Sequence, residues 1–318
     1  MARYILHSKQ QITPSTVLIT LEPKNGAGFS FNPGQYASLR FRRRGRPTPA
    51  RCFSFVNYPT ASGILQFAVR VQGKYTTAVS ELSVGQQVVV DGPFGDFGFD
   101  PEYDRISVML AGGIGITPIL GILRYVTQLK LPNQIVLLYS CRNEQDMAFA
   151  EELLTLERRN PQLRVVFVIS SGVVSHFDAG HVVKGRITSK LVEQACRNNF
   201  LTTSFFVCGS DGFMEAMTSI LQQQETPVDR IFTETFASQQ VVTQGSNWGT
   251  KLFSVYGLTA ITMLVATAGI AGMDIIRNVH TVSAAPVTQS SSSGAATNSS
   301  NAAAAQTQTY SPPVSSVS

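Results

Sequence analysis

The strongest constraint on the fold comes from a series of continuous apolar runs in the second half of the sequence. They read ISVMLAGG, QIVLLYS, RVVFVIS and SFFVCGS, and each ends in small residues. Between them lie helical stretches such as ILGILRYVTQL and DMAFAEELLTLERR. Apolar strands that alternate with amphipathic helices are typical of a parallel sheet covered on both faces. We therefore expect residues 103–236 to form a doubly wound α/β domain.

The first hundred residues show a different pattern. Short β-branched and aromatic segments, STVLITLEP, QYASLRF, CFSFVN, LQFAVRV and QQVVVDG, are separated by Gly, Pro and Asn turn signals. Strands at this spacing predict a small antiparallel barrel or sandwich over residues 1–102. A length of 318 residues, 43% of them apolar, is enough for two such cores.

The C-terminal part differs from both domains. After a linker at 237–250, residues 251–273 contain LFSVYGLTAITMLVATAGIAGM, with no charge between Lys251 and Asp274. At about 1.5 Å per residue, this segment would span roughly 33 Å, which predicts one transmembrane helix rather than a buried core helix. Residues 274–318 are rich in Ser, Ala and Thr, which predicts a disordered tail. The flanking charges leave the membrane orientation open.

Two further features limit the function. The four cysteines Cys52, Cys141, Cys196 and Cys208 form no Cys-x-x-Cys pair, so neither a zinc site, a disulfide framework nor an iron-sulfur cluster is indicated. The run RFRRRGRPTPAR at 40–51 is either a solvated hairpin loop or a docking surface for an acidic partner. Only one aromatic residue, Phe41, lies among its arginines, and the lack of repeated aromatic residues argues against nucleic acid.

The stretch AGGIGITPIL at 111–120 follows the first apolar run. Gly113 and Gly115 occupy the first two places of a dinucleotide fingerprint, but Pro118 stands where the third glycine would be. At the carboxyl end of a strand, free N–H groups and the dipole of the next helix stabilise a pyrophosphate. Proline is tolerated near the first helical position because its missing N–H would have no partner. These residues alone leave a nucleotide site and a plain tight turn open.

The glycine cluster is one of several motifs that occur in a fixed order. RCFS at 51–54 and GKYT at 73–76 precede it, and VCGSDGFMEAM at 207–217 follows. Over residues 1–236 this arrangement resembles the ferredoxin-NADP reductase superfamily, in particular its bacterial flavodoxin/ferredoxin reductase-like branch. The resemblance implies an FAD-binding β-barrel followed by an NAD(P)-binding α/β domain.

In that family, an Arg-x-Tyr-Ser strand binds the flavin. The resemblance implies that Arg51 pairs with the FAD pyrophosphate and that Phe53 lies against the isoalloxazine ring. Ser54 would donate a hydrogen bond to the ring nitrogen that accepts hydride. Phe53 replaces the family's Tyr, so the aromatic face is kept and a hydroxyl is lost. Gly73 and Thr76 match the family's second flavin segment and would hold the pyrophosphate.

The resemblance also assigns the nicotinamide nucleotide. The family's Gly-x-Gly-x-x-Pro loop corresponds to residues 113–118, with Thr117 near the pyrophosphate, and Cys208 and Gly209 lie beside the nicotinamide. Ser140 and Arg142 follow the second apolar run and suit a 2′-phosphate, which favours NADPH; NADH remains an alternative.

The family's second domain ends in a Glu and an aromatic residue that fold back to the flavin, and Glu234 and Phe236 match them. Glu234 is then a candidate for proton handling, with a solvated surface carboxylate as the alternative. Ser54, Cys208 and Glu234 are the candidate catalytic residues.

The implied function is passage of hydride from NADPH to FAD, followed by single electrons to an acidic flavodoxin or ferredoxin. The carrier would dock on the basic run through Arg42, Arg43, Arg44 and Arg46. One alternative is a membrane-associated reductase of a haem protein or quinone, and a second is a flavin-binding module without turnover. Because FAD and NADPH are cytosolic, we expect the membrane segment at 251–273 to leave residues 1–250 in the cytoplasm.

Overall fold

The computed structural model describes residues 1–26, 28, 30–172 and 177–235, which belong to one compact unit. The expected linker at 237–250, transmembrane helix at 251–273 and tail at 274–318 lie outside the described residues, as does Phe236. Over the described ranges, no helix is long and apolar enough to cross a membrane.

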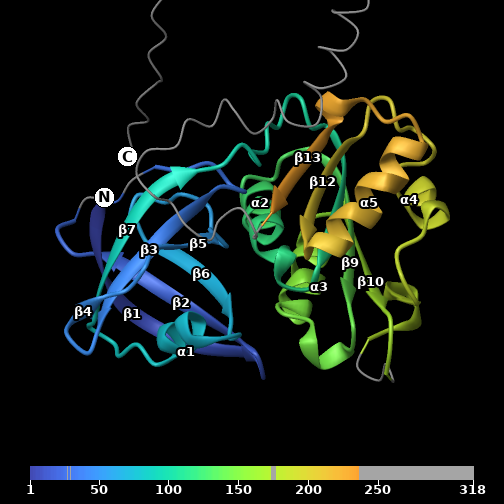
Figure 1. The fold of residues 1–318 in the computed structure, drawn as a ribbon. Coiled ribbons are helices and arrows are strands. Elements are labelled where there is room, and N and C mark those ends of the chain that lie inside the picture. Colours follow the sequence, from blue (N-terminus) through green and yellow to red (C-terminus); the bar gives the residue numbers. More distant parts are fainter. Residues whose placement is uncertain (27, 29, 173–176, 236–318) are drawn as a thin grey trace, which may run out of the picture. The chain divides into compact units, whose positions relative to one another are not determined.

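The first part is an antiparallel barrel (Figure 1). Its sheet has the strand order β4-β3-β7-β1-β2-β6. Strand β5 pairs with β3, and a bridge between Phe55 and Phe67 joins the end of β5 to β6, which closes the barrel. The elements are β1 (Ala2–Thr13), β2 (Thr16–Pro23), β3 (Tyr36–Arg43), β4 (Arg46–Pro47), β5 (Arg51–Ser54), β6 (Leu65–Arg70), α1 (Lys74–Ser80) and β7 (Gln87–Phe94).

Alternation along β5 determines which side chains line the barrel's outer face. Cys52 and Ser54 are buried, whereas Arg51 and Phe53 are half-buried on the opposite face. The basic run forms the β3–β4 hairpin, which turns through Arg44 and Gly45 at φ 50° and 79°. The expectation of a hairpin loop is therefore confirmed.

The second part is a parallel sheet with helices on both faces (Figure 1). Its order is β11-β10-β9-β8-β12-β13, and every pairing is parallel. The strands are β8 (Ile106–Gly112), β9 (Gln134–Cys141), β10 (Leu163–Ile169), β11 (Val182–Lys184), β12 (Ser204–Gly209) and β13 (Ile231–Thr235). The helices are α2 (Ile116–Gln128), α3 (Ala150–Arg159), α4 (Ser189–Ala195) and α5 (Asp211–Gln223), with short 3₁₀ turns at η1 (Gly113–Gly115), η2 (Glu144–Asp146), η3 (Ala179–His181) and η4 (Val228–Arg230).

Two separate apolar cores cover the faces of this sheet. Helices α2 and α3 pack with Met109 and Leu137 on one face, and α4 and α5 pack with Val108 and Leu138 on the other. Burial on both faces explains why these strands are apolar throughout, so the expected α/β architecture is confirmed. The helix expected from DMAFAEELLTLERR begins only at Ala150, because the residue before it adopts φ 65°.

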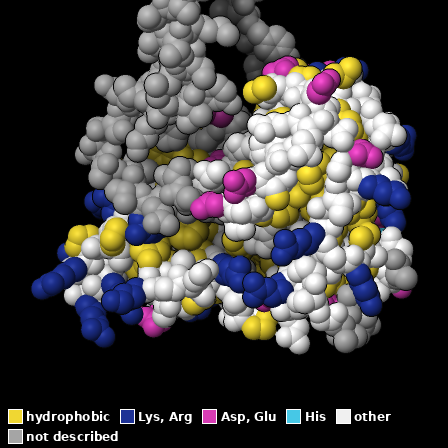
Figure 2. All heavy atoms as spheres, turned by 45° about the vertical axis from the view of Figure 1, so that its right-hand side comes forward, with side chains coloured by type: hydrophobic (Ala, Val, Ile, Leu, Met, Phe, Trp, Pro, Cys, Tyr) yellow, Lys and Arg dark blue, Asp and Glu magenta, His cyan; other side chains and the backbone are white. Residues whose placement is uncertain are grey.

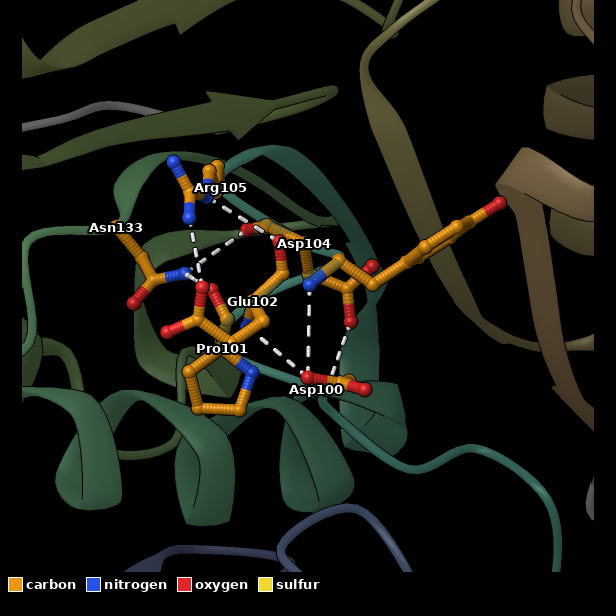
Figure 3. A network of polar contacts seen from close by, with 7 residues as sticks. Asp100, Pro101, Glu102, Asp104, Arg105 and Asn133 are labelled. Carbon is orange, nitrogen blue, oxygen red and sulfur yellow. Dashed lines mark hydrogen bonds and ion pairs between the residues drawn. The ribbon is translucent and has the colours of Figure 1, made fainter.

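A polar loop connects the barrel to the parallel sheet (Figure 3). The Asp104 carboxylate accepts a hydrogen bond from the Asp100 N–H at 2.8 Å, and the Asn133 amide donates to the carbonyls of Pro101 and Asp104 at 2.8 and 3.1 Å. Asp104 is 1% exposed, and its Oδ1 has no hydrogen-bond partner within the described part of the chain. Burial raises the pKa of Asp104 above its ordinary value.

Candidate functional site

A cavity of about 690 Å³ opens beside β5 and the start of α1. Four of the predicted flavin residues line it, namely Arg51, Phe53, Gly73 and Thr76. The rest of its lining consists of residues that were not assigned to the flavin in the sequence: Arg43, Thr48, Pro49, Cys52, Gln72, Lys74, Tyr75 and Ala78. The RCFS motif at 51–54 and the GKYT motif at 73–76 thus meet at one cavity.

Two buried polar atoms of the RCFS motif lack partners. Arg51 Nη1 and Ser54 Oγ are inaccessible to solvent, and neither makes a hydrogen bond with another described residue. A buried polar atom left without a partner costs about 1–3 kcal/mol. A ligand that presents an anion to Arg51 and a polar ring atom to Ser54 would remove this cost, so the donor set fits a flavin dinucleotide.

An aromatic pair forms one wall of the cavity. The rings of Phe53 and Tyr75 are stacked, with centroids 6.2 Å apart and an interplanar angle of 21°. The Tyr75 hydroxyl donates to the Leu39 carbonyl at 2.6 Å. Burial raises the pKa of Tyr75 well above its ordinary value. Because that hydroxyl is already bound, Tyr75 presents mainly an apolar ring. In sequence, Tyr75 lies between Gly73 and Thr76, and this position is the signal that could have identified it.

The start of α1 forms the other side of the cavity. Gly73 precedes the helix at φ 88°, a conformation that favours glycine. The Thr76 hydroxyl accepts from Gln72 N–H at 2.7 Å and donates to the Gly73 carbonyl at 3.1 Å, so it stabilises this turn. The first N–H groups of a helix have no partner within the helix, and here they leave donors for a phosphate beside the cation of Lys74.

The glycine loop lies at the carboxyl ends of the parallel strands, where the strand order reverses around β8. Gly113 has φ 54°, and a Cβ there would contact only Arg70 Nη1, at 3.8 Å. Gly115 differs, because a Cβ would lie 2.1 Å from the Cys208 carbonyl oxygen. Thus Gly113 faces open space, where a ligand can approach, whereas Gly115 permits close packing of η1 on β12.

The remaining loop residues are helix-forming and buried. Thr117 Oγ1 donates to the Ile114 carbonyl at 3.0 Å, and its side chain is 2% exposed. Pro118 is the third residue of α2, within the first turn, where a missing N–H removes no helical hydrogen bond. Both side chains therefore shape the loop, and its backbone N–H groups are what it can offer to a phosphate.

Arg70 is a functional candidate that the sequence reasoning missed. It ends β6 of the barrel, yet its guanidinium is the nearest group to the open side of Gly113. A cation from the barrel thus stands at the nucleotide loop of the α/β domain. In the sequence it is merely one residue of the expected strand LQFAVRV, and only the packing of the barrel against the loop reveals its position.

Cys208 and Glu234 lie next to each other on neighbouring strands. Strand β12 pairs Cys208 with Ala111 on one side and with Glu234 on the other. Cys208 is fully buried, and burial followed by the Glu234 charge raises its pKa well above the ordinary value. Glu234 is 7% exposed, so the alternative of a solvated surface carboxylate is wrong.

Tyr36 brings the barrel to the same acid. A Cβ on Gly95 would lie 2.8 Å from Tyr36 Cε1 and 3.1 Å from Glu234 Oε2, which shows that both groups flank Gly95. Burial, with a further contribution from Glu234, raises the pKa of Tyr36 to about 12. Tyr36 belongs to the QYASLRF segment, which was expected to form a barrel strand and was not assigned to the site.

The remaining predicted nucleotide residues lie along the same edge of the sheet. Ser140 pairs with Gly112, and Arg142 follows β9 with an exposed side chain. Gly209 contacts the ring of Phe213, whose Cδ1 would lie 2.5 Å from a Cβ on that glycine. The same ring packs on Gly112, so Phe213 lies across the ends of β8 and β12.

Comparisons with protein families match both parts of the chain. Residues 3–99 match the oxidoreductase FAD-binding domain, and residues 109–219 match the oxidoreductase NAD-binding domain. Together these models cover more than half of the sequence.

Individual proteins show the same relationship. The reductase component of a Rhodococcus jostii propane 2-monooxygenase is 26% identical over 72% of this chain and 62% of its own length. A Deinococcus radiodurans flavohemoprotein is 28% identical over 69% of this chain and 55% of its own length. The chain thus spans less than two thirds of these relatives.

Solved structures share the fold. The FAD/NAD-binding domain of nitric oxide dioxygenase from Vibrio cholerae superposes with a TM-score of 0.66 at 21% identity, covering 74% of this chain and 98% of that domain. A ferredoxin-NADP⁺ reductase from Neisseria gonorrhoeae with bound FAD and NADP gives 0.62 at 19% identity, covering 74% and 98%.

Proposed function

Because the chain belongs to the ferredoxin reductase-like oxidoreductases, whose cofactors are FAD and NAD(P)H, we propose that it passes hydride from NADPH to FAD and then single electrons to a ferredoxin- or flavodoxin-type carrier. Relatives named as reductase components of oxygenase systems support this proposal. The observation that carries it is the unpartnered buried Arg51 Nη1 at a cavity that adjoins the first turn of α1. Ser54 Oγ, three residues further along β5, is a second buried atom without a partner among the described residues.

Each residue then has a defined task. Arg51 and the first N–H groups of α1 hold the flavin pyrophosphate, and Phe53 with Tyr75 provides an aromatic wall. Ser54 donates its hydroxyl to the flavin ring. Cys208 offers a small, uncharged side chain beside the nicotinamide, since its raised pKa keeps the thiol protonated at neutral pH.

Glu234 is proposed to exchange protons near the flavin. Its carboxylate is nearly buried and stands between the Cys208 strand and Tyr36. A carboxylate positioned in this way can take up or release the proton that accompanies electron transfer. Glu234→Gln should therefore slow turnover without loss of bound flavin.

The preference for NADPH over NADH rests on Arg142. Its side chain is exposed at the end of β9, beside the loop on which the nucleotide is proposed to lie. A guanidinium can form two charge-assisted hydrogen bonds with a phosphate, which the ribose hydroxyl of NADH cannot replace.

The β3–β4 hairpin is the proposed docking surface for the acidic carrier. Its tip carries the exposed side chains of Arg42, Arg43, Arg44 and Arg46, and Arg43 also lines the flavin cavity. Lys and Arg side chains gather at the lower left of the face in Figure 2. Arg43 is paired with Glu81 at 3.0 Å, and Arg42 donates to the Gly45 carbonyl at 3.2 and 3.0 Å, which leaves Arg44 and Arg46 as the cations most available to a partner.

For localisation, we infer from the sequence that residues 251–273 anchor the chain in a membrane and that residues 1–250 face the cytoplasm. The test is protease treatment of intact cells. Protection of the N-terminal domains, with cleavage only after lysis, is the expected result. Cleavage of those domains from outside would refute this orientation.

The test of the function is acceptor-dependent turnover. The purified full chain, loaded with FAD and supplied with NADPH, should reduce a purified ferredoxin or flavodoxin faster than it reduces a membrane quinone. Faster reduction of the quinone would instead support a membrane reductase. No NADPH-dependent reduction of any acceptor would leave only a flavin-binding module.

A further inference from the structure

Arg124 on helix α2 makes contacts with both domains. Its Nη1 donates to the Val56 carbonyl at 2.8 Å and to Gln66 Oε1 at 3.0 Å, and both acceptors belong to the barrel. Its Nε and Nη2 donate to the two carboxylate oxygens of Glu152 on α3, at 2.6 and 2.8 Å. The guanidinium also lies over the Phe149 ring, 5.8 Å from the centroid.

The Arg124 site is partly buried and geometrically specific. Its side chain is 16% exposed, and the Glu152 side chain is 35% exposed. A two-point guanidinium–carboxylate pair fixes the plane of the guanidinium, so Nη1 is directed at the barrel. Lysine has a single charged atom and cannot bind the barrel carbonyl, the Gln66 amide and both Glu152 oxygens in this arrangement.

A second contact fixes the same helix one turn earlier. A Cβ on Gly121 would lie 2.9 Å from the Phe55 carbonyl oxygen, so the α2 backbone packs directly on residues 55–57. Those residues are held within the barrel, because Val56 N–H donates to the Gln66 carbonyl and Gln66 N–H donates to Asn57 Oδ1. The barrel side of the contact is therefore held in place by hydrogen bonds within the barrel.

The two segments that Arg124 and Gly121 hold together, residues 55–57 and helix α2, directly follow the two binding motifs. Residues 55–57 follow Ser54 of the flavin strand, and α2 begins immediately after the glycine loop at 113–115. We propose that Arg124 is a positioning residue that sets the separation of flavin and nicotinamide by holding α2 on the end of the flavin strand. This inference rests on the proposed function, since it assigns the geometry of the same hydride transfer.

The distance between reacting rings is a sensitive target. A displacement of about 1 Å between reacting groups can slow a reaction by about 100-fold, although both ligands remain bound. Arg124→Gln removes the charge and the two-point pair, while Gly121 still packs on the barrel. Flavin reduction should then slow by about 10- to 100-fold at saturating NADPH. Flavin content and the affinity for NADP⁺ should stay unchanged, because no binding group is altered.

The experiment is anaerobic stopped-flow reduction of the FAD-loaded full chain. Arg124→Gln is compared with wild type and with the control Arg105→Gln. The control removes an ion pair with Glu102 in which the Arg105 side chain is 75% exposed and the Glu102 side chain is 83% exposed. In parallel, hydrogen exchange of the flavin-free chain should be faster at 55–67 and 116–128 in Arg124→Gln alone. Slow reduction together with faster exchange at both segments supports the proposal.

Contrary outcomes are separable. A wild-type reduction rate in Arg124→Gln, or slowing that is fully explained by lost nucleotide affinity, would overturn the role of Arg124. If Arg124→Gln does not fold, Arg124→Lys decides, because it should still slow reduction, and a wild-type rate there would overturn the proposal. If wild type itself is not reduced by NADPH, the proposed function fails. Hydrogen exchange still tests whether Arg124 holds α2 on the barrel.

Discussion

The two fingerprint glycines look equivalent in sequence but should respond very differently to alanine. At Gly115, a Cβ would lie 2.1 Å from the Cys208 carbonyl oxygen and 2.4 Å from its carbonyl carbon. Both are backbone atoms of the interior strand β12, so η1 and β12 must separate. We expect Gly115→Ala to destabilise the fold by about 3 kcal/mol. For a domain of this size, that corresponds to a fall in Tm of roughly 6–12 °C.

Gly113→Ala meets open space instead. The nearest group to its Cβ is Arg70 Nη1 at 3.8 Å, and the only conformational cost comes from φ 54°. A non-glycine residue in this region costs about 1 kcal/mol, or roughly 2–4 °C in Tm. The new methyl group would occupy the face through which the pyrophosphate approaches, so the Kd for NADP⁺ should rise at least about tenfold, equivalent to about 1.4 kcal/mol.

The assay for both variants combines thermal unfolding with calorimetric titration of NADP⁺ well below Tm. The expected pattern is a large stability loss for Gly115→Ala and a large affinity loss with nearly normal stability for Gly113→Ala. Equal destabilisation of the two variants would refute the assigned packing. Wild-type NADP⁺ affinity in Gly113→Ala would refute the proposed approach of the pyrophosphate.

Further predictions concern the nucleotide, the carrier and pH. Arg142→Ala should weaken NADP⁺ binding far more than NAD⁺ binding in the same titration, and equal losses would reverse the preference for NADPH. Arg44→Glu with Arg46→Glu should slow reduction of an acidic carrier at low salt, with the difference fading at high salt and no effect on a neutral quinone. Burial raises the pKa of Asp104 in the folded state, so protonation of this carboxyl stabilises the fold. This contribution to the free energy of unfolding is complete below about pH 4 and is lost as the pH rises through the folded-state pKa. Asp104→Asn should therefore raise Tm at neutral pH but not near pH 4, and an equal gain at both pH values would contradict this reasoning.

The sequence predicted the architecture because burial leaves a direct mark on it. Strands covered on both faces must be apolar throughout, and this pattern located β8, β9, β10 and β12. The resemblance of the RCFS and GKYT motifs to the ferredoxin-NADP reductase superfamily likewise indicated the cavity residues Arg51 and Gly73. By contrast, residues 146–149 were expected to be helical, and the left-handed φ of Phe149 could not be anticipated from an apolar residue.

The residues missed in sequence are those whose roles depend on contacts between distant segments. Arg70 ends a barrel strand and Arg124 lies in the middle of a helix, and each looks like a surface cation until the two domains are in contact. The Thr76 hydroxyl was assigned to the pyrophosphate, but both of its hydrogen bonds are made within its own turn. Glu234 looked equally suited to the surface in the sequence, and only its pairing with Cys208 and its burial show that it is not a surface carboxylate.

The central claim is that the barrel holds FAD where the nucleotide bound at the glycine loop can reduce it. The most direct measurement is an anaerobic titration of the purified full chain with NADPH, monitored by the visible absorbance of its flavin. One FAD per chain, bleached by one equivalent of NADPH and retained poorly by Arg51→Gln, is the predicted result. A chain that binds no FAD, or whose bound FAD is not bleached by NADPH or NADH, would contradict the account.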